Sequence, residues 1–239
     1  MLENIQIESL VFLDIETVPQ SAAYDELPEA TQKLWEKKSS TLRKEDQTAS
    51  EIYQRAGIYA EFGKIICISV GLVHMDEGQR KIRLKSFASK DERQLLVDFG
   101  VLLKALSSKK NYSLCAHNGK EFDFPYIGRR MLINGLELPP ILDTAGKKPW
   151  EVNHVDTMEL WKFGDFKSYT SLELLTHVFA IPSPKGDIDG SKVAGVFYEE
   201  DDLPRIVRYC ERDVVAIVQL MLKFKCMPLI PEENISVAQ

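Results

Sequence analysis

The chain has 239 residues, of which 44% are hydrophobic and 28% charged, a composition typical of globular proteins that excludes a disordered or fibrous chain. The formal net charge of −6 argues against a broad surface for duplex nucleic acid, because such surfaces are basic. It leaves open a small site at which metal ions supply the positive charge. The apolar run at 65–73 is too short for a membrane span. The N-terminus lacks the pattern of a secretory signal.

The four cysteines form no C-x-x-C pair. This excludes a zinc ribbon and favours reduced thiols in a cytoplasmic protein.

The first expected element is a strand over residues 5–17, an apolar run of β-forming residues with acids near its end. A polar and charged stretch at about 19–61 follows, which we expect to be a helical insertion, more mobile than the rest. Further strands are expected at 64–74, 81–87 and 111–116, with a short strand or helix entry at 154–156. Helices are expected at 92–106, 124–134, 171–180 and about 203–223.

This order of elements predicts an α/β domain with a mixed sheet. Strands joined by short connections should pair antiparallel, and those joined through helices should run parallel. Ser89 with Glu92, and Thr170 with Glu173, have the spacing of capping boxes at two helix starts. We expect one domain over residues 1–226 and an irregular tail at 227–239.

Two acids in the first expected strand need an explanation. Asp14 and Glu16 are two positions apart, so their side chains leave the strand on the same face. The neighbouring residues Val11, Leu13 and Ile15 indicate a strand buried on both faces, where acids are rare unless they are paired or bind a metal. A divalent cation would relieve the repulsion between the two carboxylates. The alternative is a pair of acids exposed to water at the strand end.

Further polar residues lie on two later elements. Asn118 and Asp123 lie between a strand and a helix, where ligands of α/β sheets gather; Asp123 could instead be a helix N-cap, and Phe122 a packing residue. Tyr209 and Asp213 are one helical turn apart and share a face, although a structural hydrogen bond would explain them too. Together, four acids and a phenol could meet in one pocket, which suits phosphodiester hydrolysis with two Mg²⁺ or Mn²⁺ ions.

At these residues the sequence resembles the DnaQ-like, or DEDD, superfamily of 3′–5′ exonucleases. More narrowly, it resembles the predicted stand-alone exonucleases related to the proofreading domain of family B DNA polymerases. The three family motifs appear in order as Asp14-Ile15-Glu16, as Asn118 followed by Phe122-Asp123, and as Tyr209 followed by Asp213. The resemblance extends over roughly residues 8–224. Arg208 stands where the histidine variant has its histidine, so the tyrosine variant, DEDDy, is indicated and no histidine is expected to be the general base.

The resemblance implies a ribonuclease H-like fold, with a five-stranded mixed sheet flanked by helices. It also implies that Asp14, Glu16, Asp123 and Asp213 bind two divalent ions, Mg²⁺ or Mn²⁺, and that Tyr209 orients the nucleophile. The implied substrate contacts are Ile15, Thr17, Asn118, Phe122, Asp156 and Lys185. Helix capping is the alternative for Asp156, and a solvated side chain is the alternative for Lys185.

The activity implied is hydrolysis of single-stranded DNA from the 3′ end, with release of nucleoside 5′-monophosphates. A ribonuclease acting on RNA or short oligoribonucleotides is an alternative, because the motifs do not report on recognition of the 2′-OH. A catalytically silent module that binds nucleic-acid ends is a second alternative, against which the presence of all four acids argues. Repair, degradation and proofreading in trans remain open as roles, and protein partners are unknown.

Overall fold

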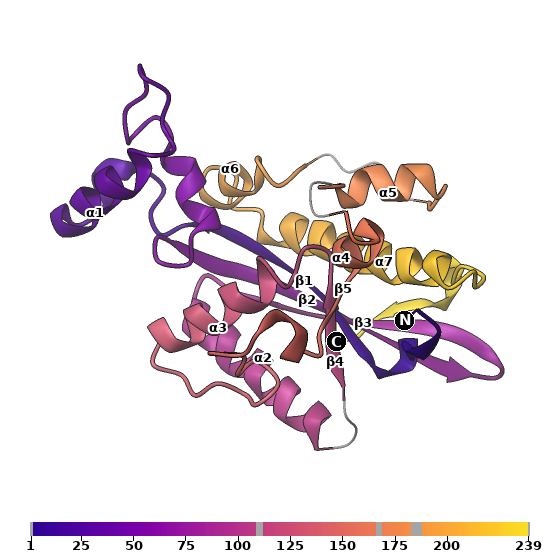
Figure 1. The fold of residues 1–239 in the computed structure, drawn as a ribbon. Helices are drawn as coiled ribbons and strands as arrows, with labels where there is room; N and C mark the ends of the chain where they lie inside the picture. Colours follow the sequence, from indigo (N-terminus) through magenta and orange to yellow (C-terminus); the bar gives the residue numbers. More distant parts are fainter. Residues whose placement is uncertain (1, 109–111, 166–168, 183–187, 239) are drawn as a thin grey trace.

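The computed structural model describes residues 2–108, 112–165, 169–182 and 188–238 of the chain (Figure 1). Its centre is a six-stranded sheet in the order β5-β4-β1-β2-β3-β6. The strands are β1 Leu10–Pro19, β2 Gly63–Asp76, β3 Gln79–Ala88, β4 Ser113–Ala116, β5 Val155–Asp156 and β6 Ile235–Val237. β1 pairs antiparallel with β2, and β2 with β3, whereas β4, β5 and β6 each join their neighbours in parallel.

The mixed sheet with helices on both faces confirms the expected α/β fold of the ribonuclease H-like type. The strand count is six rather than five, because part of the tail that was expected to be irregular forms β6. Ile235 lies opposite Ile82 of β3, and the N–H of Ala238 donates to the carbonyl of Leu84 at 2.7 Å. The tail therefore extends the edge of the sheet, which would otherwise expose the unpaired polar groups of β3.

The part of the chain that the structure describes contains seven α-helices. They are α1 Glu29–Ser39, α2 Glu92–Ser107, α3 Asp123–Ile133, α4 Thr157–Lys162, α5 Leu172–Val178, α6 Val193–Tyr198 and α7 Leu203–Phe224. Short 3₁₀ turns lie at Leu2–Asn4, Ile7–Ser9, Tyr24–Glu26, Tyr53–Ile58, Pro149–Glu151 and Glu232–Asn234. Helices α2 and α3 cover one face of the sheet, and α7 covers the other, together with α4, α5 and α6 (Figure 1).

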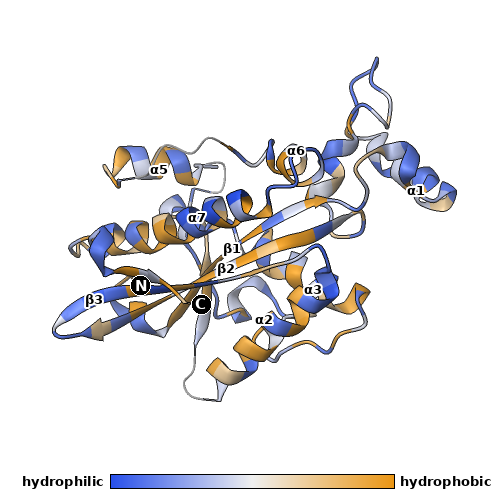
Figure 2. Ribbon diagram, turned by 180° about the vertical axis from the view of Figure 1, so that it is seen from behind, coloured by the Kyte–Doolittle hydropathy of each residue, from blue (hydrophilic) through white to orange (hydrophobic). Residues whose placement is uncertain are grey.

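Strand β1 separates two hydrophobic cores. Val11, Leu13 and Ile15 pack with residues of α2 and α3, whereas Phe12 packs with residues of α7. Because side chains alternate along a strand, Asp14 lies on the same face as Phe12 and points toward α7. The central strands are largely hydrophobic and α1 is largely hydrophilic (Figure 2).

The segment between β1 and β2 contains α1 and has a small core of its own. Trp35 is fully buried at its centre and donates its indole N–H to the carbonyl of Ala49 at 2.9 Å. The rings of Tyr53 and Phe62 contact Trp35 edge-on. This segment projects from the end of the sheet at which β1 terminates (Figure 1).

Both expected capping boxes are wrong in their cap residue. Asp91, not Ser89, caps α2, and Ser171, not Thr170, caps α5; each accepts the backbone N–H three residues further on. Glu92 has a different role from the one that the capping spacing suggested, because its buried carboxylate pairs with Arg130 of α3. The local pattern located the two helix starts to within two residues.

Among the described residues, no helix combines the length and the apolar character that crossing a membrane requires. All four cysteines are free thiols: Cys67, Cys115 and Cys210 are buried, and Cys226 is exposed.

Candidate active site

The first two acids project from the middle of the sheet. Asp14 is partly buried and Glu16 is 7% exposed, in a strand whose other residues are largely core. The pairing of β1 with β2 shifts register between Glu16 and Thr17. Such bulges re-aim side chains and are common beside active sites. Two carboxylates therefore lie on the α7 face of β1, where water is largely excluded.

Asp123 approaches the same place from the neighbouring loop. It is 3% exposed and is the first helical residue of α3, and the N-cap position belongs to Phe122. The Asp123 carboxylate accepts hydrogen bonds from its own backbone N–H and from that of Ile15 in β1. The positive end of the α3 dipole also favours a negative charge at this position. Asp123 thus faces β1 rather than capping its helix from outside.

Helix α7 supplies the remaining two expected residues. The hydroxyl of Tyr209 donates to the carboxylate of Asp213 one turn later. Between them, the thiol of Cys210 donates to Oδ2 of Asp14 at 3.3 Å and also lies 3.3 Å from the Asp14 carbonyl oxygen. Ligand atoms of Asp14, Glu16 and Cys210 all lie within 4.8 Å of one another.

The electrostatics of this cluster are unfavourable without a cation. Burial, followed by repulsion from neighbouring carboxylates, raises the pKa of Asp14 and that of Glu16 well above their usual range. Burial also raises the pKa of Asp123 to about 7 and that of Asp213 to about 6. No ion pair among the described residues involves any of these four acids.

Buried carboxylates that form no ion pair match the donors that Mg²⁺ and Mn²⁺ prefer. The residues present therefore fit divalent metal ions.

Three expected substrate contacts, Ile15, Thr17 and Phe122, are neighbours of the clustered acids in sequence. The side chain of Ile15 is 5% exposed and packs in the core on the far face of the sheet, so only its backbone reaches the acids. Thr17 is partly exposed and hydrogen-bonds Tyr126. Phe122 is partly buried, with its ring 5.3 Å from that of Tyr126. Lys185 lies outside the described residues.

Asp156 organises the loop that carries the second motif. Its carboxylate is 3% exposed and accepts the backbone N–H groups of Asn118 and Lys120, each at 3.0 Å. It also caps α4 by accepting from Met158 and Glu159. The structure thus shows the capping role that the sequence left open for Asp156. Asn118 itself has a left-handed backbone, with φ of 63°, which turns the chain toward α3.

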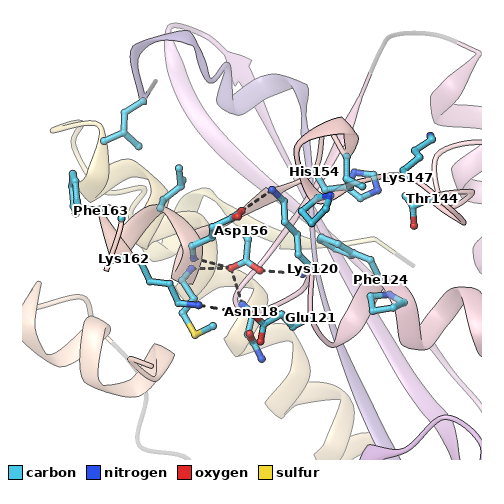
Figure 3. A pocket seen from close by; sticks show the side chains of 18 residues that line it. Asn118, Lys120, Glu121, Phe124, Thr144, Lys147, His154, Asp156, Lys162 and Phe163 are labelled. Carbon is cyan, nitrogen blue, oxygen red and sulfur yellow. Dashed lines mark hydrogen bonds and ion pairs between the residues drawn. The ribbon is translucent and has the colours of Figure 1, made fainter. Parts of the chain in front are cut away.

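A cavity of about 820 Å³ lies beside this loop (Figure 3). Asn118, Asp156 and Lys120 line it, but none of the four clustered acids does. Lys120 pairs with Glu159 at 2.6 Å. Phe124 lies on the side of the cavity toward Lys147, and Lys162 lies on the opposite side (Figure 3).

The histidines nearest the site have structural contacts. His117 bonds Thr157 Oγ1 at 2.9 Å through one ring nitrogen and the Thr170 carbonyl at 2.8 Å through the other. Burial lowers the pKa of His117, and it lowers that of His154 to about 4. Both rings are therefore neutral at neutral pH, and neither contacts the acid cluster in the described structure.

Sequence reasoning missed Cys210 as a site residue. Its position was a usable signal, because it follows Tyr209 directly and precedes Asp213 by three residues. A residue placed there on α7 points toward the strand that carries Asp14. The sequence patterns predict only that the cysteines are reduced thiols.

The site thus consists of a mixed sheet of ribonuclease H-like type with buried acids beside its central strand. A family model described as a predicted 3′–5′ exonuclease related to the exonuclease domain of PolB matches residues 58–231. The chain belongs to this family, which makes it a nuclease with a nucleic acid as its substrate and confirms the resemblance drawn from the motifs. The matched region includes Asp123 and Asp213 but not Asp14. A comparison with curated proteins gives no match.

Proposed function

We propose that the protein is a 3′–5′ exonuclease that hydrolyses the terminal phosphodiester of single-stranded DNA by a two-metal-ion mechanism and releases nucleoside 5′-monophosphates. The observation that supports this most directly is the convergence of four acids from β1, α3 and α7. They meet in a buried place, where no ion pair among the described residues involves them and only Arg212 is close enough to lower the pKa of Asp213. Asp14 and Glu16 lie outside the region that the family model matches. They join the cluster because β1 lies next to α7 in the folded chain.

The donor set identifies the residues that would hold the metals. Asp14, Glu16, Asp123 and Asp213 would hold the divalent ions. When bound, two divalent ions supply a water of lowered pKa and stabilise charge on the leaving oxygen. The oxygen-rich set favours Mg²⁺ or Mn²⁺ over zinc.

Tyr209 has a positioning role in this proposal. Burial and the surrounding carboxylates raise the pKa of its phenol, so the hydroxyl stays protonated at neutral pH. It is therefore a hydrogen-bonding group and not a base. Held by Asp213, it is oriented to fix the attacking water, while Thr17 and Phe122 border the position of the terminal nucleotide.

The test uses one 5′-labelled 20-mer sequence, as single-stranded DNA and as RNA, incubated with Mg²⁺, Mn²⁺ or EDTA. We expect a ladder that shortens from the 3′ end with either metal, nucleoside 5′-monophosphates as the product, and no reaction in EDTA. If only the RNA is shortened, the substrate is RNA and not DNA. Metal-independent binding without cleavage would instead support the non-catalytic alternative.

A variant pair assigns the activity to the cluster. Asp14→Asn keeps the shape of the side chain and removes its charge, so we expect the rate to fall by about 100-fold or more. Asp98→Asn changes an exposed acid on α2, on the opposite face of the sheet, and should leave the rate unchanged. An Asp14→Asn protein that digests DNA as fast as the wild type contradicts the proposal.

A further inference from the structure

Three arginines form a stripe along the outer face of α7. Arg205, Arg208 and Arg212 occupy positions i, i+3 and i+7, which share one side of a helix. At 1.5 Å per residue the stripe is about 10 Å long. It adjoins the site, because the guanidinium of Arg212 lies 5.9 Å from the centre of the Tyr209 ring.

The stripe borders a groove of about 780 Å³ with a defined opposite wall. That wall is the segment after α7, fixed by the buried side chain of Gln219. Gln219 donates to the carbonyl of Ile230 at 2.6 Å and accepts its N–H at 3.0 Å. The apolar part of its lining consists of Leu84, Pro182, Val215, Ala216, Leu229 and Ile235, among others.

Basic residues outnumber acidic ones in the lining of the groove, whereas acidic residues outnumber basic ones in the whole chain. Its lining contains three arginines and two acids, Glu211 and Glu232, whereas the chain has 30 basic and 36 acidic residues. Glu211 accepts a hydrogen bond from Ser86 of β3 at 2.7 Å, on the side of α7 toward the sheet edge. Arg205 forms an ion pair with Glu200, whereas Arg208 and Arg212 belong to no ion pair in the part of the chain that the structure describes.

The cavity of Figure 3 differs in this respect. Its three lysines face three acids, and two of the lysines are already in ion pairs with those acids. Of the two hollows, the groove along α7 therefore has the larger unpaired positive charge.

We propose that this groove binds the sugar–phosphate backbone of the single strand upstream of the scissile bond, so that nucleotides beyond the terminal one contact α7. This inference rests on the proposed function and extends it to the course of the substrate. Arginine binds phosphate through its planar fork of N–H donors, and an apolar floor can receive the faces of unstacked bases. Because Tyr209 and Asp213 lie on the same helix, a strand whose 3′ end reaches the acids passes next to the stripe.

The test measures binding by fluorescence anisotropy in EDTA, so that hydrolysis plays no part. The probes are labelled oligothymidylates of four and twelve nucleotides, titrated at several salt concentrations. Arg208→Ala and Arg212→Ala, singly and together, should weaken binding of the longer probe, by about tenfold for the double variant. The slope of log K against log salt should fall by about 0.7 per arginine removed. Binding of the shorter probe should change less than twofold.

Arg93→Ala, an exposed arginine on α2 on the other face of the sheet, is the matched control and should change neither probe. Equal losses for both probes, or an unchanged salt slope, would overturn the proposal. Unchanged binding of DNA with weakened binding of a labelled polyglutamate peptide would overturn it too, and would assign the groove to an acidic protein segment.

Failure of the two proposals can be told apart. If binding of the longer probe depends on the arginines but no probe is shortened in Mg²⁺, the proposal for the groove holds and the proposed exonuclease activity is refuted. If the DNA is shortened at the same rate with and without the arginines, the exonuclease activity holds and the proposal for the groove is refuted.

Discussion

The thiol of Cys210 joins the two elements that carry the acid cluster. Its hydrogen bond to Asp14 fixes a carboxylate of β1 relative to α7, on which Tyr209 and Asp213 lie. The thiol is fully buried, and burial raises its pKa, so it is a neutral donor rather than a thiolate. We therefore assign Cys210 a positioning role for Asp14.

Replacing this thiol tests that role. Cys210→Ala should lower kcat by about tenfold with little change in KM, because a carboxylate that has lost one hydrogen bond is less well oriented. Cys210→Ser keeps a donor and should recover most of the rate. Cys115→Ala removes another fully buried thiol, on β4. It should lower the melting temperature about as much as Cys210→Ala does, but leave kcat unchanged. If the two alanine variants lose kcat equally, Cys210 contributes only packing.

At the scale of elements, the close contact of α7 with the sheet places two site residues. Gly71 of β2 lies directly under this helix: a Cβ added there would be 2.8 Å from Cγ1 of Val214 and 3.3 Å from Cδ2 of Leu84. Val214 follows Asp213 and is stiff at χ1 because it is β-branched. The absent side chain at position 71 therefore sets the height of α7 above β1 and β2.

Gly71→Ala should displace α7 by a few tenths of an ångström. We expect a loss of about 1–3 kcal/mol in the free energy of unfolding and a fall in kcat, because Asp213 moves with Val214. Gly100→Ala is the matched control: the added methyl would meet only Met131 Cε, at 3.6 Å, inside α2. It should raise stability slightly through helix propensity and leave kcat unchanged. Denaturant unfolding and initial rates measure both effects, and a Gly71→Ala protein with full stability and kcat would contradict this account.

The sequence predicted those parts of the site that depend on local geometry. Asp14 and Glu16 share a face because strands alternate, and Tyr209 and Asp213 share one because a helix repeats about every four residues. The meeting of these pairs came from the family motifs, since spacing alone does not bring β1 and α7 together.

Contacts between distant residues could not be predicted in this way. The capping pattern around Glu92 concealed its real partner, Arg130 of α3, which donates to it at 2.9 Å and is itself 5% exposed. Strand β6 was missed for the same reason, because its pairing with β3 joins segments about 150 residues apart and the intervening tail is rich in proline. Local patterns report on neighbours in sequence, whereas these contacts form only when the chain is folded.

At the scale of the whole molecule, the acid cluster makes the stability of the metal-free protein depend on pH. The pKa of Asp123 is about 7 and that of Asp213 about 6 in the folded protein, against 3.8 as ordinary values. Between about pH 4 and 7 the folded chain therefore holds protons that the unfolded chain has released. The contribution of these two carboxyl groups to stability therefore falls as pH rises through this range. His154 acts in the opposite direction below pH 6.5, because its folded pKa is lowered to about 4.

A variant separates the carboxyl effect from that of the histidine. Asp123→Asn cannot ionise, so in EDTA its melting temperature relative to the wild type should be higher at pH 8 than at pH 5.5, by about 2 °C or more. For Asp98→Asn, the exposed control on α2, the difference in melting temperature from the wild type should be the same at pH 5.5 and at pH 8. Adding Mn²⁺ should stabilise the wild type at pH 8 and much less at pH 5.5, because protons compete for the same oxygens. Scanning calorimetry measures all four conditions, and a wild type that Mn²⁺ stabilises equally at both pH values would show that these carboxylates are not its ligands.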